Sequence, residues 1–323
     1  MAAVKLSRTF ALPQPALVYL CVSLFCMPCL LTLTASPAQA QAKKVMSETQ
    51  WGLVTTTFQT SRGSIQVNLP DDLAVGDTIS GTILIDPKGQ SQKDVDASTN
   101  ELNSHTVTVE NGGVESITSV NEGDFFLTLP KNAQSLRLTL KDHHGHAMAS
   151  QDVPIGTRSA GPAGSQFVGP VCGEAGRPMA MTGPCDGTLG SSRMRIAGNE
   201  VTKLAKSPRK LVVLCPPDLA GPAEAIWTEK GKEMHWHFNS VQLTFDAQSK
   251  AVTTGQNLDI KLMVRGAEGL AQPVYVTVEN KTPDVVQLGG GDKLGLKVTG
   301  DIDYTLCVQG LRHGVFGLTA CIR

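Results

Sequence analysis

Short segments in which apolar and polar residues alternate make up most of the chain after residue 50. In residues 76–85, Ile79 and Ile83 fall on one face, while Ser80 and Thr82 fall on the other. A period of two is that of a β-strand with one buried face. Further segments of this kind are residues 106–110, 125–129 and 136–141. The turn residues between them favour an antiparallel sandwich.

The same order of segments returns near the C-terminus. Residues 255–264 repeat the pattern of residues 76–85, and the sequence VTVEN occurs at residues 107–111 and again at residues 276–280. Two alternating segments on either side of a turn at residues 312–314 complete the second copy. We therefore expect two copies of one immunoglobulin-like sandwich. Their expected bounds are residues 51–155 and 239–323.

The stretch between the two copies is rich in glycine and proline. Residues 156–190 contain nine glycines and four prolines, which disfavour any regular helix or strand. We expect a linker and domain entry here, followed by a small third β domain in residues 191–238. The sequence thus predicts an all-β fold of tandem immunoglobulin-like antiparallel β-sandwiches joined by a Gly/Pro-rich linker.

Composition supports this fold class and excludes one class of partner. The chain has 32 glycines and 18 prolines, and aromatic residues make up only 5% of it. The hydrophobic cores must therefore be built mainly from Val, Leu and Ile. The formal net charge is −1 and no basic patch stands out, so nucleic acid is not expected as a partner.

Residues 1–40 read as a signal peptide rather than as part of the fold. Lys5 and Arg8 precede an apolar run at residues 16–33, and Ala38 and Ala40 stand where a signal peptidase reads small residues. The alternative is an uncleaved membrane anchor, since the run nearly reaches the length of a span. No later run is of membrane length. We expect an exported protein that is periplasmic, on the cell surface or extracellular.

A series of turn motifs occupies the middle of the chain. The motifs are Asp186-Gly187, Ile196-Ala197-Gly198, Ser207-Pro208-Arg209, Cys215-Pro216-Pro217-Asp218 and Ala220-Gly221-Pro222. This series resembles the IPT/TIG type of immunoglobulin-like domain. The chain departs from the family pattern at Ala197. The resemblance implies a part of a cell-surface or secreted protein and assigns no activity. The flanking copies look like immunoglobulin-like modules of bacterial envelope proteins.

Two histidine clusters are the candidates for a metal site. His143, His144 and His146 crowd one turn, and His235 and His237 share a face if their segment is a strand. Imidazole nitrogens bind late first-row metals. The alternatives are a hairpin tip for the first cluster and a polar strand face for the second, with Trp236 turned inward. These alternatives are favoured, and no cofactor is expected.

Residues 94–100 space oxygen ligands at alternate positions, as calcium loops do. The segment fails the helical-loop template because Thr99 stands at its glycine position and His105 at its bidentate-glutamate position. A solvated insertion within the polar loop of residues 86–102 is the favoured interpretation.

Five cysteines follow the signal peptide, an odd number for an oxidising compartment. Cys172 and Cys185 flank a flexible segment, so a disulfide between them is geometrically easy. A second pair, Cys307 and Cys321, lies opposite only if the intervening turn pivots at Gly314. Cys215 is then the odd thiol, or it competes for Cys172 or Cys185.

No motif of a catalytic nucleophile, of a zinc protease or of paired carboxylates is present. We therefore expect a non-enzymatic binding or spacer module for a protein or a glycan of the cell envelope. The alternative is a periplasmic metal-binding protein that uses the histidine clusters.

Overall fold

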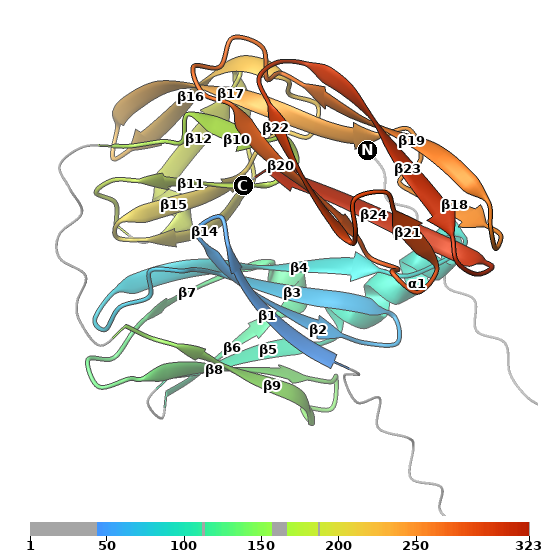
Figure 1. Ribbon diagram of the computed structural model, residues 1–323. Helices are drawn as coiled ribbons and strands as arrows, with labels where there is room; N and C mark the ends of the chain where they lie inside the picture. Colours follow the sequence, from blue (N-terminus) through green and yellow to red (C-terminus); the bar gives the residue numbers. More distant parts are fainter. Residues whose placement is uncertain (1–43, 112–113, 157–166, 187, 323) are drawn as a thin grey trace, which may run out of the picture. The chain divides into compact units, whose positions relative to one another are not determined.

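Four β-sheets account for most of the described chain, which confirms the all-β class. The computed structural model describes residues 44–111, 114–156, 167–186 and 188–322 (Figure 1). Strand pairing is antiparallel except between β10 and β17. We call the sheets I to IV in the order in which the chain first enters them.

Sheets I and II enclose the first hydrophobic core. Sheet I has the order β1-β2-β3-β4-β14-β15-β11, with β7 also paired to β4, and sheet II has the order β6-β5-β8-β9. The strands of sheet I are β1 (Lys44–Gln50), β2 (Leu53–Gln59), β3 (Gly63–Pro70), β4 (Thr78–Pro87), β7 (Asp124–Thr128), β11 (Pro178–Thr182), β14 (Lys203–Ser207) and β15 (Lys210–Leu214). Those of sheet II are β5 (Thr106–Asn111), β6 (Val114–Ser119), β8 (Ser135–Lys141) and β9 (Ala147–Pro154). Phe58, Ile65 and Val67 of sheet I pack with Leu136 and Leu138 of sheet II.

Sheets III and IV enclose a second core near the C-terminus. Sheet III has the order β13-β12-β16-β17-β19-β23-β21, with β10 also paired to β17, and sheet IV has the order β18-β24-β20-β22. The strands of sheet III are β10 (Cys172–Glu174), β12 (Ser192–Ile196), β13 (Asn199–Glu200), β16 (Gly221–Glu229), β17 (Lys232–Phe245), β19 (Asn257–Arg265), β21 (Val286–Leu288) and β23 (Ile302–Gly310). Those of sheet IV are β18 (Ser249–Val252), β20 (Val274–Asn280), β22 (Lys293–Val298) and β24 (Gly314–Ile322). Leu262 and Val308 of sheet III pack with Val276 and Phe316 of sheet IV.

A third core lies between sheet I and sheet III. Met181 and Leu211 of sheet I pack with Met194, Trp227 and Phe238 of sheet III. Sheets I and III therefore each contribute to two cores, so that four sheets form three sandwiches.

The two outer sandwiches share one pairing scheme. β4 pairs with β3 and β7, as β19 pairs with β17 and β23, and β5 lies between β6 and β8, as β20 lies between β22 and β24. The segments on either side of residues 312–314 are β23 and β24, which belong to sheets III and IV. This turn therefore crosses from one sheet to the other and does not form a hairpin.

The glycine-rich stretch holds more regular structure than its composition predicts. Within residues 156–190, β10 and β11 are strands, and residues 189–191 form one turn of 3-10 helix. The exclusion of strands there was wrong because β11, with the sequence PMAMT, contains no glycine. Met179 and Met181 enter the third core from it. Residues 157–166 lie outside the described part.

The polar loop expected at residues 86–102 is in fact largely the helix α1 (Gln92–Asn103). Ser91 caps it, because its hydroxyl oxygen accepts a hydrogen bond of 3.3 Å from the backbone N–H of Asp94. Leu102 anchors the helix in the first core. The suspected calcium ligands thus lie on a helix, and a short 3-10 turn at residues 120–122 follows later in the chain.

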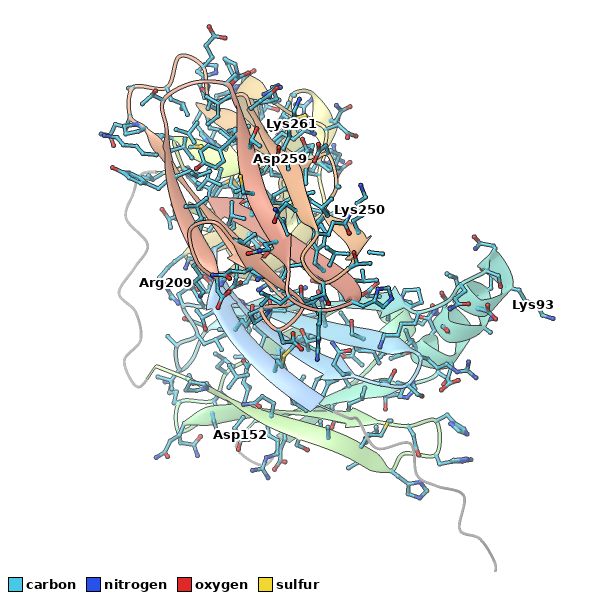
Figure 2. All side chains as sticks on the ribbon, turned by 45° about the vertical axis from the view of Figure 1, so that its right-hand side comes forward. Lys93, Asp152, Arg209, Lys250, Asp259 and Lys261 are labelled. Carbon is cyan, nitrogen blue, oxygen red and sulfur yellow. The ribbon has the colours of Figure 1, made fainter. Side chains whose placement is uncertain are left out.

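Strands and ion pairs run across the expected domain boundaries. β17 crosses the boundary at residues 238 and 239, and Ala205 of β14 pairs with Gly81 of β4. Arg209, labelled in Figure 2, lies 3.2 Å (Nε) from the Asp72 carboxylate oxygen and also donates to Asp77. The division into separate domains stays a prediction.

The expected signal peptide lies outside the described residues. Within the described part, none of the helices combines the length and the apolar character needed to cross a membrane.

Candidate functional site: a polar groove on sheet I

The β1–β2 hairpin places a tryptophan where such turns normally carry asparagine or glycine. Gln50 pairs with Leu53, so the loop consists of Trp51 and Gly52 alone. Their φ angles are 50° and 82°, and a type I′ hairpin requires positive values at both positions. A bulky side chain in this region costs on the order of 1 kcal/mol or more. Strain of this kind clusters at functional sites, so Trp51 makes this end of sheet I a candidate functional site.

One face of the strands beside this turn is polar. In β2 and β3, residues of the first core alternate with Thr55, Thr57, Gln66 and Asn68. The register pairs Thr55 with Asn68 and Thr57 with Gln66, so all four side chains stand on the same face. This face lines a groove of about 660 Å³. Other polar side chains in the lining include Glu48, Gln50, Gln59, Asp86 and Arg177, and apolar ones include Met46, Trp51, Leu53, Leu84, Leu204 and Leu214.

Cross-strand hydrogen bonds hold the floor of the groove in place. The Thr55 hydroxyl donates to the Asn68 side-chain oxygen at 2.9 Å, and the Asn68 amide donates to the Thr82 hydroxyl at 3.3 Å. Thr82 donates in turn to the Leu204 carbonyl at 2.8 Å. This chain of bonds runs across four strands of sheet I. The polar floor is therefore preorganised.

The amides above this floor keep their hydrogen-bonding capacity. Gln59 and Gln66 are half-buried, and within the described part of the chain no hydrogen bond joins either side chain to another protein group. Each carries two N–H donors and an acceptor oxygen. The groove thus presents two amides whose donors and acceptors are open to whatever enters it.

Arg177 holds Trp51 at the edge of the groove. Its guanidinium carbon lies 5.5 Å from the centre of the Trp51 ring, within the range of a cation–π contact. Arg177 Nε is 3.2 Å from Glu174 Oε1, and the other Glu174 oxygen accepts the Ile322 N–H at 2.8 Å. Burial raises the pKa of Glu174. The buried Glu174 carboxylate therefore holds Arg177, and Arg177 in turn holds Trp51.

The chemistry of the groove suits an uncharged polar ligand. Charges are limited to Glu48, Asp86 and Arg177, and the remaining polar groups are hydroxyls and amides. Hydroxyls and amides recognise neutral groups by hydrogen bonding, and an indole adds an apolar face with an N–H. No cysteine or histidine lines the groove.

The first histidine cluster lies at the β8–β9 turn, as expected. The His143 and His144 ring centres are 3.7 Å apart, and those of His144 and His146 are 6.0 Å apart. The backbone N–H groups of His144 and His146 donate to Asp142 Oδ1 at 2.9 Å. This carboxylate closes the turn, and its other oxygen lies 3.4 Å from His146 Nδ1. All three histidines are exposed.

The second cluster lies on β17. His235 Nδ1 is 3.0 Å from Glu224 and its Nε2 is 3.7 Å from Glu233, while Trp236 packs against the third core. His235 and His237 are both exposed. Among the described residues, no three His, Cys, Asp or Glu side chains are grouped as a metal site. Metal binding by either cluster stays a prediction.

All five described cysteines are free thiols in the structure. Cys172 lies in sheet III, whereas Cys185 donates to the Ser207 carbonyl of sheet I at 2.9 Å. Burial raises the pKa of Cys172 to about 11 and that of Cys185 to about 12. Cys307 and Cys321 lie in sheets III and IV respectively, so the hairpin that would set them opposite each other is absent.

The groove residues were missed by the sequence analysis. The available signal was the dipeptide Trp51-Gly52 between two alternating segments, which is the spacing of a two-residue hairpin. A tryptophan at that turn position is the unusual feature.

Comparisons with known proteins identify no family. No protein-family model matches the chain, and no curated protein does. Solved structures with similar folds include SGBP-B of the Bacteroides ovatus mixed-linkage glucan utilization locus, in complex with a mixed-linkage heptasaccharide. It is 10% identical, covers 89% of this chain and 96% of its own, and has a TM-score of 0.28.

Two further structures are similar at the same low level. SGBP-B from a complex xyloglucan utilization locus in Bacteroides uniformis is 8% identical, with coverage of 88% and 99% and a TM-score of 0.23. Domains 4 and 5 of the S-layer protein SbsC are 13% identical, with coverage of 67% and 92% and a TM-score of 0.20. At TM-scores this low, none of these likenesses bears on function.

Proposed function

We propose that this chain is a non-enzymatic module of the cell envelope that binds a neutral glycan in the groove on sheet I. The observation that carries the proposal is the open row of Thr and Gln side chains that ends at the strained Trp51. Export of the mature chain, residues 41–323, is part of the proposal.

The match between this groove and a sugar chain is chemical. Each sugar unit offers hydroxyls, which both donate and accept hydrogen bonds, and Gln59 and Gln66 can do the same through one planar group. Sugar rings also have apolar C–H faces, which an indole such as that of Trp51 can cover. An open sheet face accommodates a chain that continues at both ends, whereas a small cofactor is normally enclosed.

The test is a binding measurement with the mature chain. Soluble neutral polysaccharides and acidic ones are titrated separately by calorimetry and by affinity electrophoresis. We expect a neutral polysaccharide to bind, and Trp51→Ala to weaken its binding at least about tenfold, equivalent to about 1.4 kcal/mol. Gln66→Ala should weaken it by a smaller factor, because the other groove amides remain.

The matched control replaces an exposed aromatic elsewhere. Tyr275, on β20 of sheet IV, is 54% exposed, and Tyr275→Ala should leave the affinity unchanged. Binding that survives Trp51→Ala and Gln66→Ala would place the glycan outside the groove. Exclusive binding of acidic polysaccharides would contradict the neutral ligand.

A further inference from the structure

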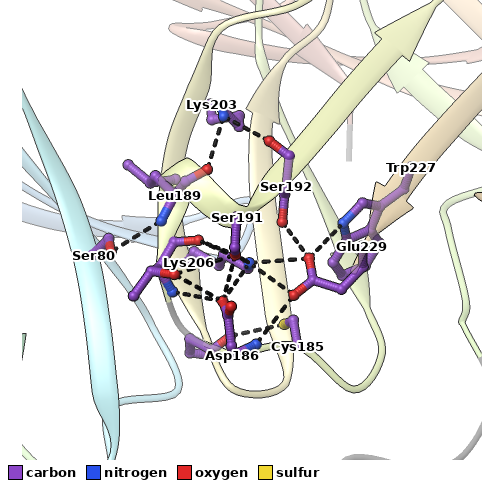
Figure 3. A network of polar contacts seen from close by, with 12 residues as sticks. Ser80, Cys185, Asp186, Leu189, Ser191, Ser192, Lys203, Lys206, Trp227 and Glu229 are labelled. Atoms are coloured by element: carbon purple, nitrogen blue, oxygen red, sulfur yellow. Dashed lines mark hydrogen bonds and ion pairs between the residues drawn. The ribbon is translucent and has the colours of Figure 1, made fainter. Parts of the chain in front are cut away.

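A fully buried lysine lies among carboxylates in the third core. Lys206 of β14 has a side-chain exposure of 0%. Its Nζ lies 2.8 Å from Asp186 Oδ1 and 3.1 Å from Glu229 Oε2, and it also donates to the Thr188 carbonyl at 2.8 Å (Figure 3). We call Lys206, Asp186, Glu229 and the hydroxyl residues around them the Lys206 cluster. The network joins sheet I to sheet III.

Glu229 is the deeper of the two carboxylates. Its side chain is only 5% exposed. It accepts hydrogen bonds from the Ser192 hydroxyl, from Trp227 Nε1 at 3.3 Å and from the Asp186 N–H at 3.3 Å. These donors fix both of its oxygens beside the Lys206 amine.

Several donors converge on one oxygen of the Asp186 carboxylate, beside the Lys206 amine. Oδ1 accepts from the Thr188 N–H and hydroxyl, both at 3.0 Å, and from the Ser191 hydroxyl at 2.6 Å. Although partial burial opposes it, the hydrogen bonds from Lys206, Ser191 and Thr188 hold the pKa of the Asp186 carboxyl below its ordinary value, so these donors already stabilise the carboxylate. They can also stabilise the further negative charge that attack on the carboxyl carbon would place on the same oxygen, as in an oxyanion hole. The side chain is 26% exposed, so a departing water molecule has a way out.

We propose that Lys206 and Asp186 condense to form an intramolecular amide, with Glu229 relaying the protons. The lysine ammonium passes one proton to Glu229, and the free amine attacks Cγ of Asp186 to form the C–N bond. A C–O bond of Asp186 then breaks. The departing oxygen takes the proton from Glu229 and a second one from the nitrogen, and leaves as water. No electrons are transferred, and Glu229 is regenerated.

Three features of the site favour this reaction over a persistent ion pair. Fixed contact between amine and carboxyl gives intramolecular reactions effective molarities of about 10⁵ M or more. Burying a separated ammonium and carboxylate carries a desolvation cost that the neutral amide avoids. After the reaction, Glu229 keeps its donors from Ser192 and Trp227 and gains the new amide N–H.

The experiment is mass spectrometry of the mature chain under denaturing conditions. We expect a mass one water molecule below that of the sequence. Trypsin should fail to cut after Lys206, and digestion should yield a branched peptide that joins Lys206 to Asp186. A folded wild-type chain that keeps the full sequence mass after long incubation would overturn the proposal, as would a water loss located at other residues.

Two variants test the assigned roles. Glu229→Gln has nearly the same shape but cannot relay a proton, so it should keep the full mass. Lys203→Arg is the control, because among the described residues the Lys203 amine donates to the Leu189 and Ser192 carbonyls, both at 2.8 Å, and not to either carboxylate. This variant should still lose water. A linked Glu229→Gln chain would overturn the role of Glu229. The digest of the wild-type chain shows whether the amide forms, even if a variant fails to fold.

Discussion

The groove and the Lys206 cluster are two polar regions that share strand β14 but have opposite character. Leu204 lines the groove, whereas Lys206, two residues later, reaches into the third core. The groove is open, and uncharged amides and hydroxyls share its lining with apolar side chains and few charges. The cluster is closed and charged, and each of its charged groups has several partners.

Open hydrogen-bonding capacity distinguishes a binding surface from an internal polar network. A half-buried polar group with open hydrogen-bonding capacity, such as Gln66, can exchange its water for an incoming ligand. A buried polar group whose partners all lie within the protein, such as Lys206 as an ion pair or as the proposed amide, gains nothing from a ligand and strongly affects folding. Variants in the two regions should therefore change different measured quantities.

The largest expected effect is the loss of the buried lysine. Lys206→Met removes the cation beside Asp186 and Glu229 and also prevents the proposed amide. Breaking a buried ion pair from one side costs about 3–5 kcal/mol of unfolding free energy, and loss of the cross-link would add to this cost. Urea denaturation measures this loss. Arg62→Ala, which breaks the exposed pair with Glu101, should change stability by no more than about 1 kcal/mol. Equal midpoints for Lys206→Met and wild type would remove the contrast.

The next largest effect is a pH-dependent change in stability that comes from Glu174, the partner of Arg177 beside Trp51. Burial raises its folded pKa above 4.5, so the folded state binds this proton more tightly than the unfolded chain. The stabilisation from this proton is complete below pH 4.5 and is lost as the pH rises through the folded pKa. A tenfold difference in proton affinity between the two states is worth about 1.4 kcal/mol. Glu174→Gln should flatten this part of the curve of stability against pH. A variant curve with the same slope as wild type would contradict the assignment.

Two strained turns can be compared to test whether backbone strain at Trp51 serves glycan binding. Trp51 and Lys230, with φ of 50° and 49°, occupy equivalent positions in two-residue hairpins. Lys230→Asn should stabilise by about 1 kcal/mol and leave glycan affinity unchanged. Trp51→Asn should stabilise less, because the contact with Arg177 is lost, and it should abolish binding. Thermal unfolding and calorimetry measure both quantities.

Thiol reactivity distinguishes open from closed surroundings without changing the fold. Cys307 is exposed, so a maleimide should label it within minutes in the native state. Cys185 lies beside the Lys206 cluster, and burial raises its pKa to about 12, so it should react only after denaturation. Rapid native labelling of Cys185 would show that the cluster opens to solvent.

Local patterns predicted several strands of both outer sandwiches, because the period of two is a property of each strand alone. Residues 106–110 and 276–280 are indeed equivalent strands, β5 and β20. The helix α1 was missed because its sequence, QKDVDASTNELN, has almost no apolar stripe, and the cap at Ser91 was overlooked.

Pairing between distant strands was beyond the sequence patterns. Nothing in the neighbourhood of Ala205 reveals that it lies beside Gly81. Lys206 stands in the short segment KLAKS, where a lysine reads as exposed. The groove was equally hidden, since Thr55 and Gln66 become one surface only through the register of β2 with β3.

Strand β17 has a consequence for how the molecule comes apart. Its first half packs in the third core through Phe238, and its second half packs in the last core through Val241. Sheet I joins the first core to the third core in the same way. Unfolding of one sandwich therefore removes a sheet that the neighbouring core needs. The three sandwiches should therefore unfold together in a single calorimetric transition, as one cooperative unit rather than as three independent ones.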